Sequence, residues 1–330
     1  MDKLRIGVAG VGHLGKWHAA NLNEIAQTEL VGVYDTHKEV GEQIASENGV
    51  KHFISLAEML TEVDAVDVVV PTSAHYETAS QSLEAGKHVF IEKPITGTLE
   101  EAEKLICLAE EKKLKIQVGH IERFNPAFVS LEGFNFQPMF IESHRLAKFN
   151  PRGMDVSVVL DLMIHDIDAV LSMVRSPIKN TDASGANVVG DKADIANARI
   201  QFENGAIANI TASRISQKNM RKMRIFQKNH YITIDFLEKV SEVFTLISNG
   251  EEFNGIDAIL IDEPEYMGRK KKVYMQRPVI KESNALKVEL AEFADSIIHD
   301  KEVKVTAEDG RRALEVAFDV IDKIDKTKRV

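Results

Sequence analysis

Three scarcities limit what this chain can be. Its single cysteine, Cys107, excludes an internal disulfide framework and any cysteine-based zinc site. No apolar run reaches the length of a membrane-spanning helix, and an apolar strand that begins at Leu4 leaves no room for a signal peptide, so we expect a cytoplasmic protein. Basic residues are fewer than acidic ones, with 41 Lys and Arg against 51 Asp and Glu. The resulting net charge of −10 argues against binding to nucleic acid or to an anionic membrane.

Apart from these shortages the composition is that of a globular protein. The 330 residues include 44% hydrophobic and 28% charged residues, and this length suffices for two domains with sizeable cores. Cys107 lies in an apolar helical pattern with Leu105, Ile106 and Leu108. That pattern predicts a small buried side chain rather than a nucleophile.

The first strand and the glycines that follow it have the pattern of a dinucleotide-binding unit. The apolar run Leu4–Ala9 predicts a buried parallel strand, and Gly10, Gly12 and Gly15 follow it in a G-x-G-x-x-G spacing. The first glycine permits the tight turn, the second lets the backbone approach a pyrophosphate, and the third lets the next helix pack close to the strand. The N–H groups at the start of that helix then face the phosphates.

Asp35 bears on the choice of cofactor. It ends the second apolar run, Leu30–Tyr34, where a carboxylate can accept hydrogen bonds from the adenosine ribose hydroxyls and repels a 2′-phosphate. The next residues, Thr36 and His37, supply no permanent cation. We therefore predict NAD(H) rather than NADP(H). The alternative for the whole segment is a glycine-rich turn that binds no nucleotide.

Strand and helix patterns divide the chain in two. Apolar strands and amphipathic helices alternate over residues 1–122, which predicts an α/β nucleotide-binding domain with a doubly wound parallel sheet. Over residues 123–330 the pattern becomes α+β with an open, mostly antiparallel sheet. The segments expected there are a short helix at Asn125-Pro126, a strand Phe140–Leu146, a long helix Asp155–Val174, alternating strands from Ile178 to about Leu246, and closing helices Ala285–Ile298 and Ala307–Ile324.

Lys93 is the first candidate catalytic residue. Glu92-Lys93-Pro94 directly follows the predicted strand His88–Ile91. Ligands of a doubly wound sheet gather beyond the carboxyl ends of its strands, so Lys93 is expected on the cofactor side. A partly desolvated lysine there can hydrogen-bond a substrate hydroxyl and help to move its proton. The alternative is a solvated loop lysine.

A second candidate cluster lies on the long helix. Asp161, His165 and Asp168 fall at positions i, i+4 and i+7, which puts them on one face of an otherwise apolar helix. A histidine beside a carboxylate can accept the proton of an alcohol near neutral pH. The alternative is a buried His–Asp pair that satisfies itself. No third ligand with metal-like spacing accompanies Asp161 and His165, so no metal is predicted.

Three further segments carry candidate contacts. Arg123 and Asn125 follow the last strand of the first domain and are predicted to reach the substrate; the alternatives are an interdomain salt bridge and a helix cap. Thr72 and His75 follow the fourth strand and are predicted to contact the cofactor, although His75 has the alternative of a helix-entry residue. The basic run Arg269–Lys272 either meets phosphates of a large substrate or lies in a solvated loop.

Taken in this order, the segments resemble the Gfo/Idh/MocA oxidoreductase family. The stretches that match are GVAGVGHLGKWHA, the acid Asp35, HYETASQSLEAGKHVFIEKP, the segment Arg123–Pro126 and Asp161-x-x-x-His165. The resemblance implies an N-terminal Rossmann domain and a C-terminal domain whose open sheet forms dimer or tetramer interfaces. It also implies hydride transfer between NAD(P) and a hydroxyl-bearing carbon of a sugar, inositol or nucleotide sugar. Lys93 and His165 are then the catalytic pair, and Asp161 orients the substrate.

The resemblance has two departures and one finer indication. Where family members often carry a glycine-rich segment before the D-x-x-x-H helix, this chain has Pro151–Ser157. Where they usually have Thr-Pro or Asn-Pro after the fourth strand, it has Pro71-Thr72. The strings GHIERFNPA and DLMIHDIDAV are similar to a bacterial subgroup that resembles UDP-N-acetylglucosamine 3-dehydrogenases.

The motifs predict an NAD-dependent oxidoreductase, and the resemblance implies that it acts at C3 of a UDP-N-acetylhexosamine. The alternatives are a dehydrogenase of a free sugar or inositol, and a non-catalytic NAD-binding regulatory or scaffold protein. The expected assembly is a homodimer or homotetramer. The predicted cofactor-binding residues are Gly10, Gly12, His13, Leu14, Gly15, Asp35, Thr72, His75, Glu92 and Lys93. The predicted substrate-binding residues are Arg123, Asn125, Asp161 and His165.

Overall fold

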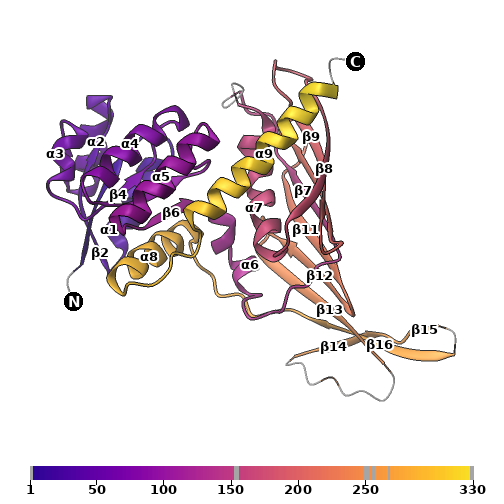
Figure 1. The fold of residues 1–330 in the computed structure, drawn as a ribbon. Coiled ribbons are helices and arrows are strands. Elements are labelled where there is room, and N and C mark those ends of the chain that lie inside the picture. The colour runs from indigo at the N-terminus through magenta and orange to yellow at the C-terminus, as the bar shows by residue number, and fades with distance from the viewer. Residues whose placement is uncertain (1–2, 152–155, 249–252, 254–256, 267, 328–330) are drawn as a thin grey trace. The chain divides into compact units, whose positions relative to one another are not determined.

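The computed structural model describes residues 3–151, 156–248, 253, 257–266 and 268–327. The chain divides into two units (Figure 1). Unit 1 comprises Met1–Phe124 and Ser283–Glu315, and unit 2 comprises Asn125–Glu282 and Val316–Val330. The sequence had assigned all of 123–330 to the second domain, whereas the structure groups residues 283–315 with the first unit.

Unit 1 is built on a parallel sheet. Its described strands form a six-stranded sheet in the order β3-β2-β1-β4-β5-β6. The strands are β1 (Leu4–Ala9), β2 (Thr28–Tyr34), β3 (Lys51–Phe53), β4 (Ala65–Val68), β5 (His88–Glu92) and β6 (Ile116–Gly119). The helices are α1 (Gly15–Glu24), α2 (Lys38–Asn48), α3 (Leu56–Leu60), α4 (Thr72–Glu84), α5 (Leu99–Lys112), the 3₁₀ turn η1 (Ile121–Phe124) and α8 (Ala285–Ile298). The strand order reverses between β1 and β4, which creates the crevice where such sheets bind ligands.

Helix α8 belongs to unit 1 because its apolar face is buried there. Leu290, Phe293 and Ala294 lie in one apolar cluster with residues of β1, α1, β2 and β5. The Phe293 ring packs edge-on against Phe90 of β5 at 5.8 Å between ring centroids. Burial of large apolar side chains is the main stabilising term in a core, so this contact ties a late segment to the first sheet.

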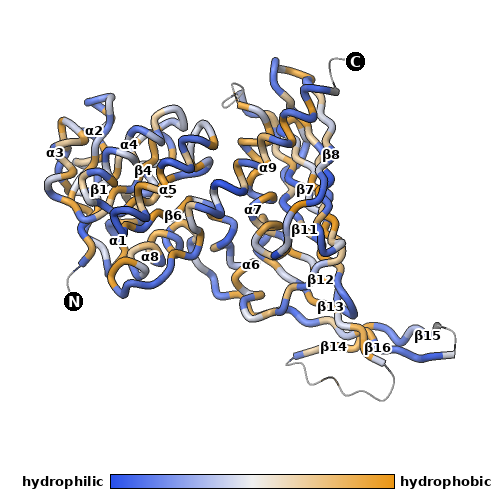
Figure 2. The backbone as a smooth tube through the Cα atoms, in the orientation of Figure 1, coloured by the Kyte–Doolittle hydropathy of each residue, from blue (hydrophilic) through white to orange (hydrophobic). Residues whose placement is uncertain are grey.

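Local signals explain where several helices begin. Thr98 forms a capping box with Glu101 at the start of α5, and Thr306 exchanges the equivalent bonds with Asp309 at the start of α9 (Ala307–Thr327). Hydrophobic and hydrophilic residues alternate along α9 (Figure 2), and Ala313, Ala317 and Val320 are buried, among others. This is the pattern of an amphipathic helix with one side in a core.

The prediction that Cys107 is buried was wrong. The Cys107 side chain is exposed on α5, whereas Ala102, Leu105 and Ala109 form the buried face of that helix. Position 107 lies about 200° around the helix from position 105, so an apolar neighbour in sequence does not imply a shared face.

Unit 2 is built on a broad open sheet. Its described strands form a ten-stranded sheet in the order β14-β16-β13-β12-β11-β7-β10-β9-β8, with β15 paired to β16. Among the described strand pairs, β7 and β10 run parallel and the others antiparallel. The strands are β7 (Phe140–Leu146), β8 (Ile178–Ala186), β9 (Ile195–Phe202), β10 (Ile207–Ser213), β11 (Met220–Gln227), β12 (His230–Asp235), β13 (Val240–Ser248), β14 (Ile259–Asp262), β15 (Glu265–Tyr266) and β16 (Arg269–Gln276).

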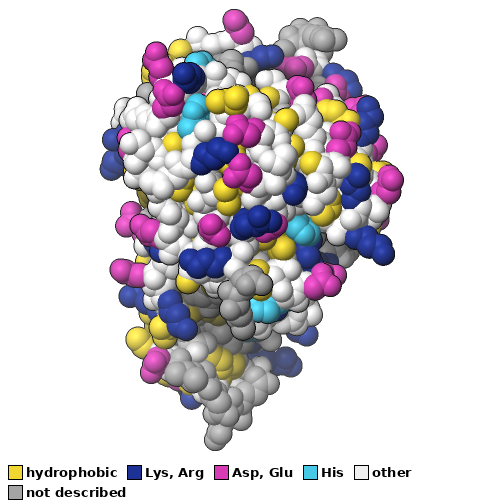
Figure 3. Space-filling view, turned by 90° about the vertical axis from the view of Figure 1, so that its left-hand side faces the viewer, with side chains coloured by type: hydrophobic (Ala, Val, Ile, Leu, Met, Phe, Trp, Pro, Cys, Tyr) yellow, Lys and Arg dark blue, Asp and Glu magenta, His cyan; other side chains and the backbone are white. Residues whose placement is uncertain are grey.

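One face of this sheet is buried and the other is open. Burial alternates along β7, β9 and β10, as expected for strands with one covered face. The helical elements of unit 2 are α6 (Pro126–Val129), the π-helical turn η2 (Val159–Met163), α7 (Ile164–Met173) and the end of α9. Figure 3 draws another face of the protein, the one on the left-hand side of Figure 1. Acidic and basic side chains are interspersed over it, which is the pattern of a solvated surface.

The predicted helix over Asp155–Val174 needs correction. Residues 152–155 lie outside the described part of the chain, and the described helical stretch opens with the π turn η2 before α7 begins at Ile164. The basic run Arg269–Lys272 lies on strand β16 rather than in a loop. In the described part of the chain, no helix is long and apolar enough to cross a membrane.

Candidate active site

The glycine-rich turn after β1 has the geometry that a dinucleotide requires. Gly10 has φ = +86°, and a Cβ there would lie 2.8 Å from the backbone of Val69 after β4. A Cβ on Gly15 would lie 1.9 Å from the carbonyl oxygen of Gly10, so a side chain there is incompatible with this turn. A Cβ on Gly12 would meet nothing within 4 Å, which leaves the approach to the backbone open. These residues fit a bound pyrophosphate at the start of α1.

Asp35 supports the same turn. Its carboxylate accepts hydrogen bonds from the backbone N–H of Val11 at 2.9 Å and from that of His37 at 2.8 Å. The Asp35 side chain is 10% exposed, so a carboxylate with a fixed direction stands at the end of β2. Asp35 therefore both shapes the glycine-rich loop and presents negative charge where a ribose 2′ substituent would lie.

We expect the wild-type protein to bind NAD(H) at least about tenfold more tightly than NADP(H), because Asp35 repels the 2′-phosphate. Asp35→Asn keeps the size of the side chain and its acceptor oxygen for Val11 but removes the charge, so it should narrow that ratio. Isothermal titration calorimetry with NADH and NADPH measures the two dissociation constants and hence their ratio. Glu39→Gln, on the adjacent helix α2, is the matched control. Tighter binding of NADPH by the wild type would contradict the assignment.

Lys93 follows β5, at the carboxyl end of the parallel sheet. Its side chain is half-buried, and its backbone N–H donates to Oε2 of Glu92 at 3.1 Å. His75 on α4 is buried between the two neighbouring loops. Its Nδ1 lies 2.8 Å from the carbonyl oxygen of Pro94, and its Nε2 lies 2.9 Å from that of Val70. Burial lowers the pKa of His75, although both backbone contacts oppose that shift. A neutral ring has one N–H, so it donates to only one of the two carbonyl oxygens.

The other predicted cofactor contacts lie at the ends of the same strands. Leu14 is 52% exposed at the N-cap position of α1, and Thr72 is half-buried at the start of α4. His13 is exposed in the turn between Gly12 and α1. The structure thus brings the predicted cofactor residues to one edge of the unit 1 sheet.

In unit 2, η2 and α7 carry the second candidate cluster. Asp161 lies within the π turn and His165 is the second residue of α7; both are half-buried. Asp168, one turn further along, is only 2% exposed. π-helical turns occur frequently at functional sites because they redirect side chains locally. The three residues of the predicted cluster therefore differ in exposure: Asp161 and His165 are partly exposed to solvent, whereas Asp168 is buried.

Sequence reasoning missed the contacts that hold this helix. Asp166 is buried and accepts hydrogen bonds from Ser143 Oγ at 2.7 Å and from Arg145 Nε at 2.6 Å, both on β7. A buried ion pair with further hydrogen bonds fixes orientation, so Asp166 sets the rotation of the helix that carries His165. A signal was available: Ser143 and Arg145 are polar residues on the buried, alternating face of β7.

Arg123 and Asn125 have clear structural contacts. Arg123 Nη2 lies 3.3 Å from the carbonyl oxygen of Lys304 and 3.9 Å from a carboxylate oxygen of Asp309, all within unit 1. Asn125 caps α6 through Ala127 N–H at 3.1 Å and donates to the carbonyl oxygen of Phe236 at 3.0 Å. The contacts of Asn125 match its alternative of a helix cap, whereas those of Arg123 lie within unit 1 and are not an interdomain salt bridge. Contact of either residue with the substrate stays a prediction.

Comparisons with known proteins bear on the whole chain. Residues 4–120 match the model of an oxidoreductase family with an NAD-binding Rossmann fold, and residues 130–232 match the Gfo/Idh/MocA C-terminal domain. The chain belongs to the Gfo/Idh/MocA oxidoreductase family. The predicted family, fold class and NAD cofactor are thereby confirmed.

Several members of the Gfo/Idh/MocA family are similar over most of their length. UDP-N-acetylglucosamine 3-dehydrogenase of Acidithiobacillus ferrooxidans is 37% identical over 97% of both chains. Its solved structure covers 99% of both chains with a TM-score of 0.88. The scyllo-inositol 2-dehydrogenase (NAD(+)) of Bacillus subtilis is 30% identical, covering 65% of this chain and 68% of its own length. Family membership makes the chain an NAD-binding dehydrogenase.

Proposed function

We propose that this dehydrogenase acts on a UDP-N-acetylhexosamine and oxidises the hydroxyl at C3 of the sugar. The observation that carries the proposal is the match to a UDP-N-acetylglucosamine 3-dehydrogenase over 97% of both chains. The match to the scyllo-inositol enzyme covers less of this chain, at 65%. The Arg123–Pro126 segment and the Asp161-x-x-x-His165 pattern lie within the longer match.

The proposed chemistry assigns a role to three side chains. NAD⁺, when bound, accepts the hydride that leaves the substrate carbon. His165 accepts the proton of the substrate hydroxyl as the general base, and Asp161 orients the sugar. Lys93 stabilises the negative charge that develops on the hydroxyl oxygen, because an ammonium in a half-buried position interacts strongly with an oxyanion.

A panel of substrates tests the proposal by the rate of NADH formation. UDP-N-acetylglucosamine should be oxidised, whereas free N-acetylglucosamine should lose most of kcat/KM because the nucleotide contacts are missing. UDP-glucose tests the need for the N-acetyl group. Faster oxidation of scyllo- or myo-inositol would favour the inositol alternative, which the Bacillus relative supports. NAD binding without turnover of any compound would favour a regulatory or scaffold protein.

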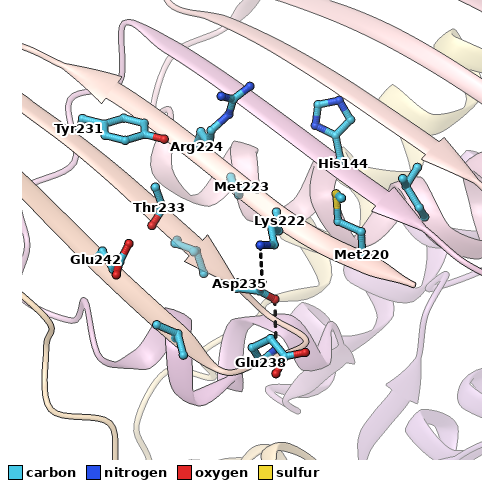
Figure 4. A pocket seen from close by; sticks show the side chains of 13 residues that line it. His144, Met220, Lys222, Met223, Arg224, Tyr231, Thr233, Asp235, Glu238 and Glu242 are labelled. Atoms are coloured by element: carbon cyan, nitrogen blue, oxygen red, sulfur yellow. Dashed lines mark hydrogen bonds and ion pairs between the residues drawn. The ribbon is translucent and has the colours of Figure 1, made fainter. Parts of the chain in front are cut away.

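We also propose that the open face of the unit 2 sheet binds a second copy of the chain. This face carries a row of aromatic rings, in which Phe226 lies between Phe140 and Tyr231, and Phe244 follows Tyr231. Beside it lies a hollow of about 720 Å³ whose walls combine charged, polar and apolar side chains from β7, β11, β12 and β13 (Figure 4). Aromatic side chains, methionine and arginine are enriched in protein interfaces.

Light scattering in solution should therefore give the mass of a dimer or tetramer. Tyr231→Glu introduces a buried charge in such an interface and should lower that mass. Glu110→Lys on the exposed side of α5 is the control for a change of surface charge. A monomer at micromolar concentration would contradict the proposal.

A further inference from the structure

Three ionisable side chains are buried beneath the carboxyl end of the unit 1 sheet. His18 comes from α1, Asp67 from β4 and Glu92 from the end of β5. Their side chains are 2%, 0% and 13% exposed. Burying ionised groups is costly unless they pair with one another, so the geometry of their pairing is informative.

His18 contacts a carboxylate on each side of its ring. Its Nδ1 lies 2.9 Å from Oδ2 of Asp67, and its Nε2 lies 3.4 Å from Oε1 of Glu92. Ionised carboxylates only accept hydrogen bonds, so both contacts are satisfied together when both ring nitrogens carry protons. Burial alone would lower the pKa of His18, but Asp67 and Glu92 together raise it well above its usual value. His18 is therefore an imidazolium at neutral pH.

Glu92 connects this imidazolium to Lys93. One carboxylate oxygen of Glu92 faces His18, and the other accepts the backbone N–H of Lys93 at 3.1 Å. Burial would raise the pKa of Glu92, but the hydrogen bond and charge of His18 and the charge of Lys93 outweigh it and lower that pKa. Burial raises the pKa of Asp67, and the charge and hydrogen bond of His18 oppose that rise, so the ionised form of Asp67 depends on its contact with His18.

The surroundings leave little freedom to this cluster. A Cβ on Gly119 of β6 would lie 2.7 Å from Oε1 of Glu92, so the strand backbone packs directly against the carboxylate. The Phe90 ring lies 5.9 Å from the His18 ring, edge-on, and closes the apolar side. His75 of α4 is close enough for the charge of Glu92 to raise its pKa, although burial lowers that pKa more strongly. The ionisable groups that bear on His18 are thus Asp67 and Glu92 directly, with Lys93 and His75 beyond Glu92.

We propose that His18 is a positioning residue for Lys93. As an imidazolium it holds the Glu92 carboxylate in the orientation that binds the backbone of Lys93, and Asp67 keeps His18 doubly protonated. The cluster also joins α1, the helix that follows the glycine-rich turn, to the loop that carries Lys93. The inference rests on the proposed catalytic role of Lys93.

Asp67→Asn is the test, since it removes one charge and keeps the size of the side chain. In this inference the wild type keeps His18 protonated at neutral and mildly alkaline pH. In Asp67→Asn the pKa of His18 should be lower than in the wild type, so kcat should fall about tenfold as the pH is raised and His18 loses its proton. The KM for sugar and the Kd for NAD should change little. Asp64→Asn, just before β4 and paired with Arg5 at the surface, is the matched control and should show no such fall.

A spectroscopic readout makes the test independent of turnover. In ¹H–¹⁵N spectra of Asp67→Asn, the amide signal of Lys93 should shift with the same midpoint as the His18 ring, and in the wild type neither should titrate at neutral and mildly alkaline pH. His18→Gln provides a second variant, in which kcat should be low at every pH with NAD binding retained. A neutral His18 in the wild type would overturn the inference. So would a Lys93 amide signal that does not shift while His18 titrates in Asp67→Asn. Failure of the proposed function is distinct, because Lys93→Met would then leave turnover intact.

Discussion

Lys93→Met should lower kcat by about two to four orders of magnitude and leave the Kd for NAD within about twofold of the wild-type value. The methionine matches the length of the lysine stem but cannot donate to the oxygen that gains negative charge. Lys93 lies directly after β5 and is half-buried, so water replaces its ammonium poorly. Initial rates of NADH formation and calorimetric titration with NAD measure the two quantities.

Two further variants sharpen the Lys93 experiment. Lys112→Met removes an exposed ammonium from the last turn of α5 and should leave kcat unchanged. Lys93→Arg keeps the charge but replaces a compact ammonium with a planar fork, so partial activity is expected. A Lys93→Met protein that retains more than half of the wild-type rate would remove Lys93 from the catalytic scheme.

His165→Asn should reduce kcat by about two to four orders of magnitude, because no side chain then accepts the hydroxyl proton as the hydride leaves. The Kd for NAD should change little, because every predicted cofactor-binding residue is retained in this variant. The measurement is the rate of NADH formation as a function of pH. Because the variant lacks the general base, its residual rate should depend less on pH than the wild-type rate does.

The controls for His165 use the same unit. His230 is the first residue of β12, and its Nδ1 lies 3.0 Å from the backbone carbonyl oxygen of Lys228. His230→Asn should therefore keep full activity. Asp166→Asn weakens the ion pair with Arg145 that orients α7, so it should lower kcat less than His165→Asn does. A His165→Asn protein with a wild-type rate and pH profile would show that another group accepts the proton.

Elements with a strong local period were predicted well. The strand Leu4–Ala9 and the helices Leu99–Lys112 and Ala285–Ile298 have the predicted bounds. Burial of one face of each element dictates its apolar period, so the sequence carries the information locally. Strand β3 and the strands after Leu246 escaped prediction. β14 is exposed along its length, and β3 has only three residues, so neither has a clear apolar alternation.

Contacts between distant segments were beyond the sequence. The G-x-G-x-x-G turn and the residues after β5 were found because each belongs to one continuous motif. His18 and Asp67, in contrast, are 49 residues apart. Nothing in the sequence around either residue indicates that the two side chains pair with each other. The packing of α8 on the first sheet was missed for the same reason. Periodicity tells which face of an element is buried, but not against which partner.

The discontinuity of unit 1 has a consequence for how the molecule is made. Leu290, Phe293 and Ala294 complete an apolar cluster whose other members are synthesised far earlier. While the ribosome is still adding unit 2, the parallel sheet exposes the patch that α8 later covers. The nascent nucleotide-binding unit therefore stays incomplete until Ser283–Glu315 emerges, and a fragment that stops at Phe124 should bind NAD poorly.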